Sequence, residues 1–238
     1  MGRAQGRATA ANRRRYAHDE VAGYLRDSYH RRRLRLALDL LGEHLDLAER
    51  PLVADLGAGG GQVSAVLARR GARPIACDVV LDAGRAALRA GVPAVALDLG
   101  EPLPFRSGAL DGILAGEVIE HVYDPASLLA ECHRVLRPGG VLVLTTPNLA
   151  TPQDRLRFLF GHAPRHVDPF HEYLHLHIRP FTAGLLATGL RLAGLTPTAL
   201  RSNHVVWRTR FGDLRSARVA RHLPTWGGSL VVSAIRPT

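Results

Sequence analysis

The chain has 238 residues, of which 46% are apolar and 22% charged. These globular proportions exclude a disordered chain, a collagen or a coiled coil, and there is no membrane span. The net charge is +10, and all 31 basic residues are arginine. Residues 51–175 sum to −2, whereas residues 1–50 carry +4 and residues 176–238 carry +8. The basic ends therefore predict surfaces for anionic partners around a nearly neutral core, with a solvated arginine-rich face as the simpler alternative.

The N-terminal 50 residues are expected to be helical. Leu34, Leu38, Leu41 and Leu45 recur at helical spacing and form an amphipathic stripe that ends before Pro51. We expect residues 1–50 to form a helical cap on a domain that spans residues 51–238.

Apolar runs of strand length alternate with helical patterns from Pro51 onward. The expected helices include one capped by Asp82, one starting at Asp124 and Pro125, and one from Thr182 to Ala193. The expected strands cover residues 52–56, 74–78, 92–97, 110–115, 141–146, 196–200 and 230–235. Continuous apolar strands between helices predict an α/β fold, with a doubly wound, Rossmann-like, mainly parallel seven-stranded sheet, helices on both faces and the N-terminal helical cap.

Two segments lack this alternation. Residues 148–178 are polar, rich in histidine and without clear periodicity, and we expect them to form a lid. Residues 203–228 form a basic connection, in which we expect Trp207 and Trp226 to pack on the core. Cys77 and Cys132 occupy apolar positions that suit buried thiols better than a disulfide, so a cytoplasmic protein is expected.

A glycine loop, in the sequence VADLGAGGGQ, ends the first strand and opens a helix. Glycines let a ligand approach the backbone, and a helix N-terminus favours an anion. The dinucleotide fingerprint would place its third glycine where this chain has Gln62. Asp55 followed by Gly57, Gly59 and Gly61 indicates a different ligand.

These motifs resemble those of class I S-adenosylmethionine-dependent methyltransferases. The resemblance covers about residues 50–149, and the stretch EVIEHVYDPASLLAECHRVLRPGGVLVLTTPN is similar to the ubiquinone-biosynthesis O-methyltransferase subgroup. It implies S-adenosyl-L-methionine as cofactor. The cofactor-binding residues that it implies, together with the loop above, are Asp55, Gly57, Gly59, Gly61, Asp78 for the ribose hydroxyls, Asp98 for the adenine amino group, Leu99 beside the ring and Glu117 near the methionine end.

A sulfonium donor is already activated, so the protein mainly has to hold the acceptor in line with the methyl group in a water-poor site. A base is needed only when the acceptor must lose a proton, and histidine suits that role near neutral pH. The candidates are His121, which the resemblance places near the site, and His166 in the lid segment. A structural or solvated histidine is the simpler interpretation of each.

The sequence His171-Glu172-Tyr173-Leu174-His175 matches the HExxH signature of zinc proteases. Prolines crowd the segment, and no glutamate follows Glu172 that could act as a third ligand. We therefore interpret the motif as a chance match and assign no metal ligands, while a non-hydrolytic metal site among these histidines stays open.

The expected function is transfer of a methyl group by in-line displacement to an oxygen, or less favourably a nitrogen or carbon, of a small or lipid-linked molecule. The chain reads Ala115-Gly116-Glu117-Val118 where enzymes that methylate amino groups of DNA and RNA carry Asn/Asp-Pro-Pro-aromatic. An RNA-modifying methyltransferase is one alternative, although nucleic acid is the less favoured partner, and a non-catalytic donor-binding or scaffold protein is another. The basic C-terminal region also suits an anionic membrane surface, which would make the protein peripheral at the membrane.

Overall fold

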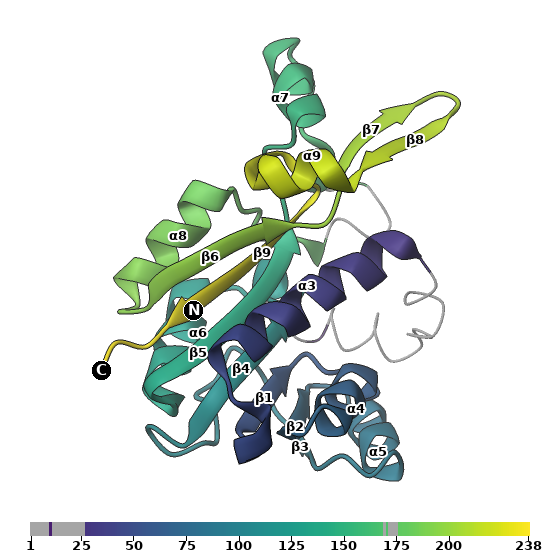
Figure 1. Ribbon diagram of the computed structural model, residues 1–238. Coiled ribbons are helices and arrows are strands. Elements are labelled where there is room, and N and C mark those ends of the chain that lie inside the picture. The colour runs from purple at the N-terminus through teal and green to yellow at the C-terminus, as the bar shows by residue number, and fades with distance from the viewer. Residues whose placement is uncertain (1–9, 11–26, 169, 171–175) are drawn as a thin grey trace.

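A computed structural model describes residue 10, residues 27–168, residue 170 and residues 176–238. Its centre is a seven-stranded sheet in the order β3-β2-β1-β4-β5-β9-β6 (Figure 1). The first five strands of the chain pair in parallel, and β9 runs antiparallel to both β5 and β6. The strands are β1 (Leu52–Leu56), β2 (Arg73–Asp78), β3 (Ala94–Ala96), β4 (Leu110–Gly116), β5 (Leu136–Pro147), β6 (Thr196–Ser202) and β9 (Ser229–Ile235). The predicted fold class is confirmed.

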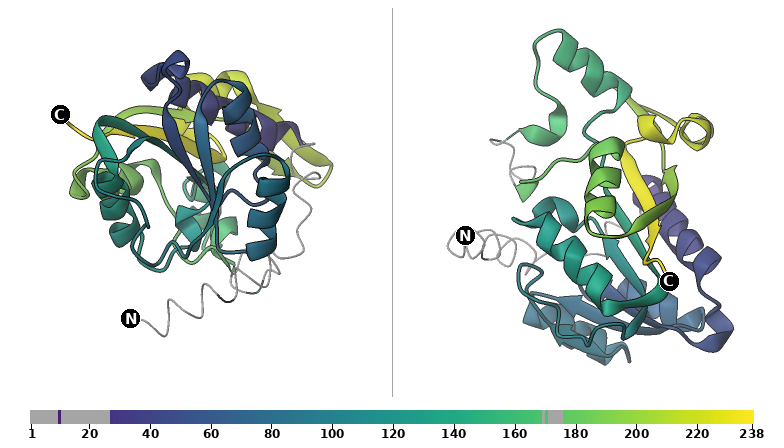
Figure 2. Two further views of the ribbon diagram at one scale, coloured as in Figure 1. Left: turned by 90° about the horizontal axis from the view of Figure 1, so that it is seen from below. Right: turned by 90° about the vertical axis from the view of Figure 1, so that its left-hand side faces the viewer.

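Helices cover both faces of the sheet (Figure 2). On one face, α3 (Ser28–His44) and α4 (Gln62–Arg69) pack on the sheet, with α5 (Leu81–Arg89) beside α4. On the other face lie α6 (Pro125–Val135) and α8 (Ala183–Leu192). Both faces are therefore dry, which is why the central strands read as continuous apolar runs.

The expected helix starts are largely confirmed. Asp124 accepts a hydrogen bond from the Ser127 backbone N–H at 3.1 Å, and Thr182 caps α8 in the same way. Such caps satisfy backbone donors that have no partner inside the helix. The expected cap at Asp82 is wrong, because α5 begins at Leu81 and the Asp82 carboxylate pairs with Arg85 on the surface instead.

The segment after β5 has more structure than its sequence indicates. A helix, α7 (Pro152–Leu159), follows Thr151, whose hydroxyl accepts from the Asp154 N–H. A single turn, η3 (Arg165–Val167), comes next. The helix is hard to predict from the sequence because α7 is short and buries only Asp154 fully, so it has little apolar periodicity.

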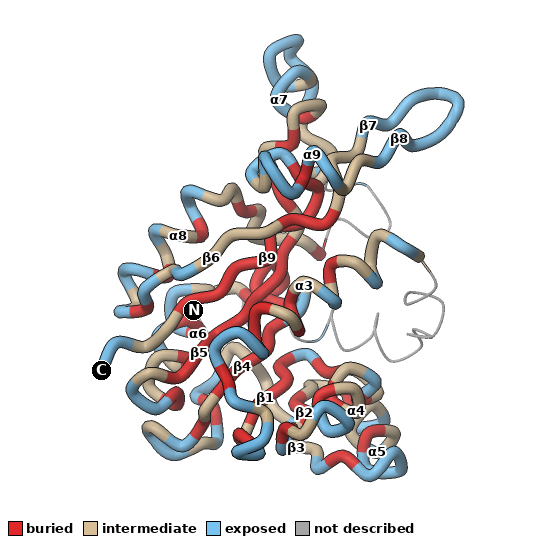
Figure 3. Tube along the Cα trace, viewed as in Figure 1, coloured by how far each residue is buried: buried red, intermediate tan, exposed pale blue. Residues whose placement is uncertain are grey.

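The basic connection contains a two-stranded hairpin, β7 (Val205–Thr209) and β8 (Gly212–Ser216), followed by α9 (Ala217–His222) and η5 (Pro224–Trp226). The hairpin projects from the body of the molecule beside α7 (Figures 1 and 3). Trp207 and Trp226 are each 40% exposed, so the prediction that they pack on the core is wrong. Trp207 lies on β7 of the projecting hairpin, away from the sheet face that would have buried it.

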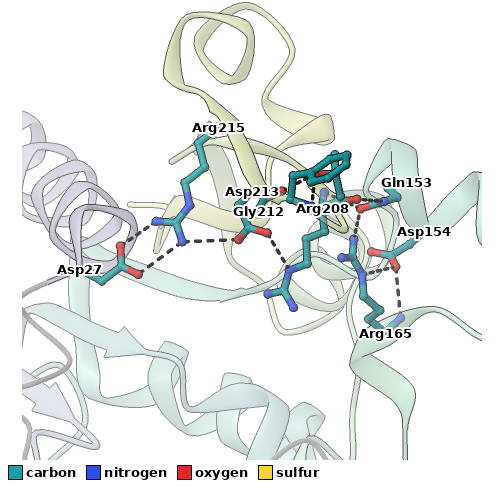
Figure 4. A network of polar contacts seen from close by, with 10 residues as sticks. Asp27, Gln153, Asp154, Arg165, Arg208, Gly212, Asp213 and Arg215 are labelled. Atoms are coloured by element: carbon teal, nitrogen blue, oxygen red, sulfur yellow. Dashed lines mark hydrogen bonds and ion pairs between the residues drawn. The ribbon is translucent and has the colours of Figure 1, made fainter.

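Polar contacts connect the hairpin to α7 and α3 (Figure 4). The Gln153 side chain exchanges two hydrogen bonds with the backbone of Arg208, of 2.8 and 3.0 Å. Arg215 pairs with Asp27, the N-cap of α3, at 2.8 Å, and also approaches Asp213. Segments that are distant in the sequence thus form one connected end of the molecule.

Two further expectations concern the interior and the membrane. Cys77 and Cys132 are buried free cysteines, as predicted. Among the helices that the structure describes, none combines the length and apolar character needed to cross a membrane.

Candidate active site

The carboxyl ends of four neighbouring strands bring the predicted ligand-binding residues to one edge of the sheet. Leu56 at the end of β1 pairs with Cys77 on one side and Ala115 on the other. Asp78 pairs with Ala96, so the loop after β3 starts beside it. Because ligands of open α/β sheets bind at this edge, the parallel register assembles the candidate site.

The glycine loop is held tightly against the sheet. Gly57, Gly59 and Gly61 all have positive φ, from 51° to 78°. A Cβ at Gly57 would clash with the Val118 side chain, and one at Gly61 would lie 2.7 Å from Ala87. Glycine is therefore required both by the backbone conformation and by close packing. Gly61 makes no side-chain cap for α4, and in the first turn the Ser64 backbone N–H is hydrogen-bonded to Asp55. An anion bound at this helix N-terminus would therefore use the other N–H groups of the first turn.

Asp78 ties the loop to β2. Its Oδ2 accepts from the Gly59 N–H and its Oδ1 from the Val80 N–H, each at 2.8 Å. A carboxylate offers about four acceptor positions, so both oxygens can still accept a hydroxyl from a ligand. Asp78 is half-buried, which leaves it within reach of the loop surface.

Asp55 has a different environment from Asp78. It is buried, and its Oδ2 accepts from the Ser64 hydroxyl at 2.6 Å. Burial raises the pKa of Asp55 to about 7, against the opposing effect of the Ser64 hydrogen bond. The side chain thus connects the end of β1 to α4 from inside the protein.

Asp98 and Leu99 lie in the loop after β3. Asp98 accepts from the Gly100 N–H at 2.9 Å, and Leu99 packs against the main apolar core while staying half-buried. This loop starts from a hydrogen bond between the Leu97 N–H and the Asp78 carbonyl. The predicted adenine-side and ribose-side residues are therefore neighbours along one edge.

Glu117 follows β4 with φ of 55°, a strained conformation for a residue with a side chain. Its N–H and Oε1 contact Thr145 on β5, and its Oε2 pairs with Arg33 of α3 at 2.7 Å. Burial raises the pKa of Glu117, and the Arg33 guanidinium opposes that shift.

Arg33 is the site residue that sequence reasoning missed. It is buried, whereas its neighbours Arg31 and Arg32 are not. Helical spacing contains the signal, because residue 33 shares a face with the buried residues Ala37 and Leu40.

A cluster of histidines lies beside Glu120 in the turn after β4. The rings of His121 and His177 are 4.9 Å apart, and those of His177 and His166 are 6.3 Å apart. The structure thus brings both predicted catalytic histidines, His121 and His166, to one cluster through His177. Burial lowers the pKa of His121 to about 4 and that of His177 to about 3, and burial lowers the pKa of His166 as well.

The lid segment contains further histidines besides His166 and His177. His162 is exposed. The HExxH sequence from His171 to His175 lies outside the described residues.

Known proteins are similar to this chain over the residues that form the candidate site. Residues 54–144 match the Methyltransferase domain family. The chain is 30% identical over 152 residues to a ubiquinone biosynthesis O-methyltransferase of Parvibaculum lavamentivorans, a match that covers 60% of this chain and 59% of that protein. The chain spans about half the length of the curated relatives it matches.

Solved structures share the fold over most of the chain. A candidate methyltransferase from Bacillus halodurans superimposes with a TM-score of 0.66 at 19% identity, over 86% of this chain and 99% of that one. The 1,6-didemethyltoxoflavin-N1-methyltransferase of Burkholderia thailandensis, solved with S-adenosylhomocysteine, gives 0.56 at 23% identity, over 87% and 79%.

The sheet order and strand-end site define a Rossmann-like α/β protein of the class I methyltransferase fold. Within it, residues 54–144 match the Methyltransferase domain family, and part of the chain is similar to ubiquinone biosynthesis O-methyltransferases. The resemblance predicted from the sequence motifs is confirmed.

Proposed function

We propose that this protein is an S-adenosylmethionine-dependent methyltransferase that methylates an oxygen of a small or lipid-linked molecule. The observation that carries the proposal is the strand-end arrangement: a glycine loop at a helix N-terminus, the half-buried Asp78 and the adjacent Asp98. These groups suit a carboxylate, a ribose diol and an adenine amine in that order along the edge. Several matched relatives are named ubiquinone biosynthesis O-methyltransferases, which favours oxygen as the acceptor atom.

The bound donor supplies an electrophilic methyl group on a sulfonium. The N-terminus of α4 would hold the donor's carboxylate, Asp78 would accept from its ribose hydroxyls, and Asp98 would accept from its adenine amine. Glu117, fixed by Arg33 and Thr145, lies at the end of β4, where the methionine part is expected. In-line transfer then depends mainly on how the acceptor is positioned.

Removal of the proton from an acceptor hydroxyl is the remaining chemical step. His121 and His166 are the candidate bases, and both are neutral near pH 7 because burial lowers the pKa of each. A base with a pKa near 4 removes a hydroxyl proton inefficiently, so the environment of His121 is poorly matched to that role. A His121→Ala variant with unchanged activity at every pH would eliminate His121 as the base.

An apolar or membrane-bound acceptor suits the projecting end of the molecule. Exposed aromatic and aliphatic side chains lie on α7, the hairpin and α9, with arginines between them in the sequence. Phe158, Leu159 and Phe160 are between 73% and 74% exposed, and Phe211 at the hairpin tip is 85% exposed. Such a surface suits shallow contact with an anionic lipid layer, which would bring a lipid-linked acceptor to the enzyme.

Calorimetry with S-adenosylmethionine tests the donor assignment. We expect Asp78→Asn to weaken binding by at least about tenfold, because two hydroxyl contacts lose a charged acceptor. Asp82→Asn is the matched control, since Asp82 is an exposed carboxylate four residues away. Equal donor affinity in wild type and Asp78→Asn would contradict the assignment.

Transfer of labelled methyl groups into cell extracts separates the function classes. Label in the small-molecule or lipid fraction supports the proposal. Label in RNA would support an RNA-modifying enzyme, and donor binding without transfer would support a non-catalytic protein.

A further inference from the structure

The guanidinium of Arg208, on β7 of the hairpin, has only a distant acidic partner. Its Nε lies 3.8 Å from the Asp213 carboxylate, which is longer than a hydrogen bond. Among the residues that the structure describes, this guanidinium makes no hydrogen bond and no other ion pair. Its side chain is 62% exposed, so its N–H donors are accessible to a ligand.

The charge around Arg208 favours an anion. Arg208 shares Asp213 with Arg215, whose guanidinium lies 3.6 Å from Asp213 and 2.8 Å from Asp27. Residues 151–168 and 204–222, which include α7, η3, the hairpin and α9, carry eight arginines and three aspartates. This end of the molecule therefore has an excess of positive charge, which attracts anionic ligands.

A polar network holds the backbone of Arg208 in place (Figure 4). Gln153 of α7 donates to the Arg208 carbonyl and accepts from the Arg208 N–H. Arg165 donates to Gln153 Oε1 at 2.6 Å, and the Arg165 backbone N–H donates to the buried Asp154 at 3.1 Å. The base of the Arg208 side chain is thus fixed, and a pre-positioned group loses less entropy when a ligand binds.

Arg208 lies close enough to the candidate active site to affect the pKa of two residues there. Burial raises the pKa of Tyr29 on α3, and the charge of Glu117 adds to this shift while Arg208 opposes it. Burial lowers the pKa of His166 on η3, and the charge of Arg208 lowers it further. Such effects decrease with distance, so Arg208 lies near both elements. The donor-side residues follow β1, β2 and β3, which places Arg208 on the side where the acceptor is expected.

From this arrangement we propose that Arg208 binds a carboxylate or phosphate group of the methyl acceptor. The inference rests on the proposed function, because it names the chemical class of the molecule that the same site methylates. A planar guanidinium donates two parallel hydrogen bonds to either kind of oxyanion. Asp213 stays paired with Arg215 when Arg208 turns to the ligand, so binding leaves no carboxylate without a cation.

Ligand-detected NMR on the full chain, without donor, tests the anion preference. Benzoate and benzamide have nearly the same size and differ in charge, and phenyl phosphate represents the phosphate class. We expect wild type to bind one of the two anions at least about tenfold more tightly than benzamide. The anion that binds more tightly identifies the class of oxyanion.

Variants of two arginines on the hairpin assign this preference to one side chain. Arg208→Gln should lose the preference for anions, and Arg208→Lys should keep part of it, because lysine retains the charge without the planar fork. Arg210→Gln is the matched control, since Arg210 lies over the Phe211 ring at the exposed tip. An unchanged midpoint of thermal unfolding in all three variants shows that they fold.

The charge of the methylated products provides a second readout. When wild type transfers labelled methyl groups into a cell extract, most of the label should bind to an anion-exchange column. Arg208→Gln should reduce this bound label at least about tenfold relative to Arg210→Gln. Extraction into an organic solvent then separates an anionic lipid from a water-soluble carboxylate or phosphate.

Three results would each overturn the role of Arg208: equal affinity of wild type for all three probes, equal anion binding by Arg208→Gln and Arg210→Gln, or labelled products that are neutral. Absence of any labelled product, together with absence of donor binding, would instead contradict the methyltransferase assignment. The NMR titrations need neither donor nor turnover, so failure of the anion site and failure of the proposed function are distinguishable.

Discussion

Single buried charges explain much of the electrostatics of this protein. Asp55 is the clearest case, because burial raises its pKa to about 7 while its ordinary value is 3.8. Such a carboxyl binds its proton more tightly in the folded state than in the unfolded chain. Its favourable contribution to the free energy of unfolding is complete below about pH 4 and is lost as the pH rises through about 7.

The raised pKa of Asp55 predicts how the stability of an Asp55→Asn variant differs from that of wild type as the pH changes. Relative to wild type, the variant should gain stability between about pH 4 and pH 7, by up to about 4 kcal/mol, and the difference should stay constant above pH 8. Urea denaturation of both proteins across this range measures it. A difference that does not change with pH would show that Asp55 titrates normally.

The Arg33–Glu117 pair predicts a second effect of a single residue. Removing one partner of a buried pair leaves an uncompensated charge, so Arg33→Met should destabilise the fold by about 3 kcal/mol. Arg35→Met, on the same helix with 79% of its side chain exposed, should change stability by less than about 0.5 kcal/mol.

Denaturant titrations compare the two arginine variants directly. Adding Glu117→Gln to Arg33→Met should restore part of the loss, because the orphaned charge is then absent. Equal destabilisation by the two arginine variants would contradict a special role for Arg33.

At the scale of elements, the loop between β1 and α4 depends on backbone conformation. Gly61→Ala forces a side chain into positive φ and against Ala87, so it should cost more than about 1 kcal/mol and weaken donor binding. Gly42→Ala, at an exposed position in the last turn of α3, meets no atom within 4 Å and should stabilise the fold by about 0.5–1 kcal/mol.

Opposite signs for these two glycine substitutions are the expected result in thermal or urea unfolding. A neutral Gly61→Ala would mean that the loop tolerates a different conformation from the one described. Calorimetry with donor then separates a local change in the loop from a global loss of stability.

At the scale of the whole molecule, α7, the β7–β8 hairpin and α9 form a projecting end that exposes apolar and arginine side chains. We expect vesicles of phosphatidylglycerol to sediment the protein and neutral phosphatidylcholine vesicles not to, with binding that decreases as salt rises. Phe158→Ser combined with Phe160→Ser should abolish most of this binding, because the Phe158 ring on α7 and the Phe160 ring directly after the helix are both exposed.

Leu88→Ser is the matched control for the membrane prediction. Leu88 is 58% exposed on α5, an element remote from the projecting end. Equal loss of vesicle binding in the control and in the phenylalanine variant, or equal binding to neutral vesicles, would argue against this surface.

Local patterns in the sequence were enough to predict the sheet and the resemblance to methyltransferases, and they also name the candidate donor-binding residues. Those features are local: a buried parallel strand is a continuous apolar run, and Gly57, Asp78 and Asp98 each follow directly on such a run. Local patterns fail where a segment is short or exposed, which is why α7 and the hairpin were missed and the tryptophans misplaced.

Tertiary structure alone decided which charges are buried together and which histidines meet. Arg33 and Glu117 are 84 positions apart, and His121 and His177 are 56 apart, so no spacing rule relates them. Their contacts depend on how α3 and residues 176–179 pack on the strand ends. The effect of one such group on the pKa of another decreases steeply with the distance between them in space. Spacing along the sequence does not reveal that distance, so only the packed structure does.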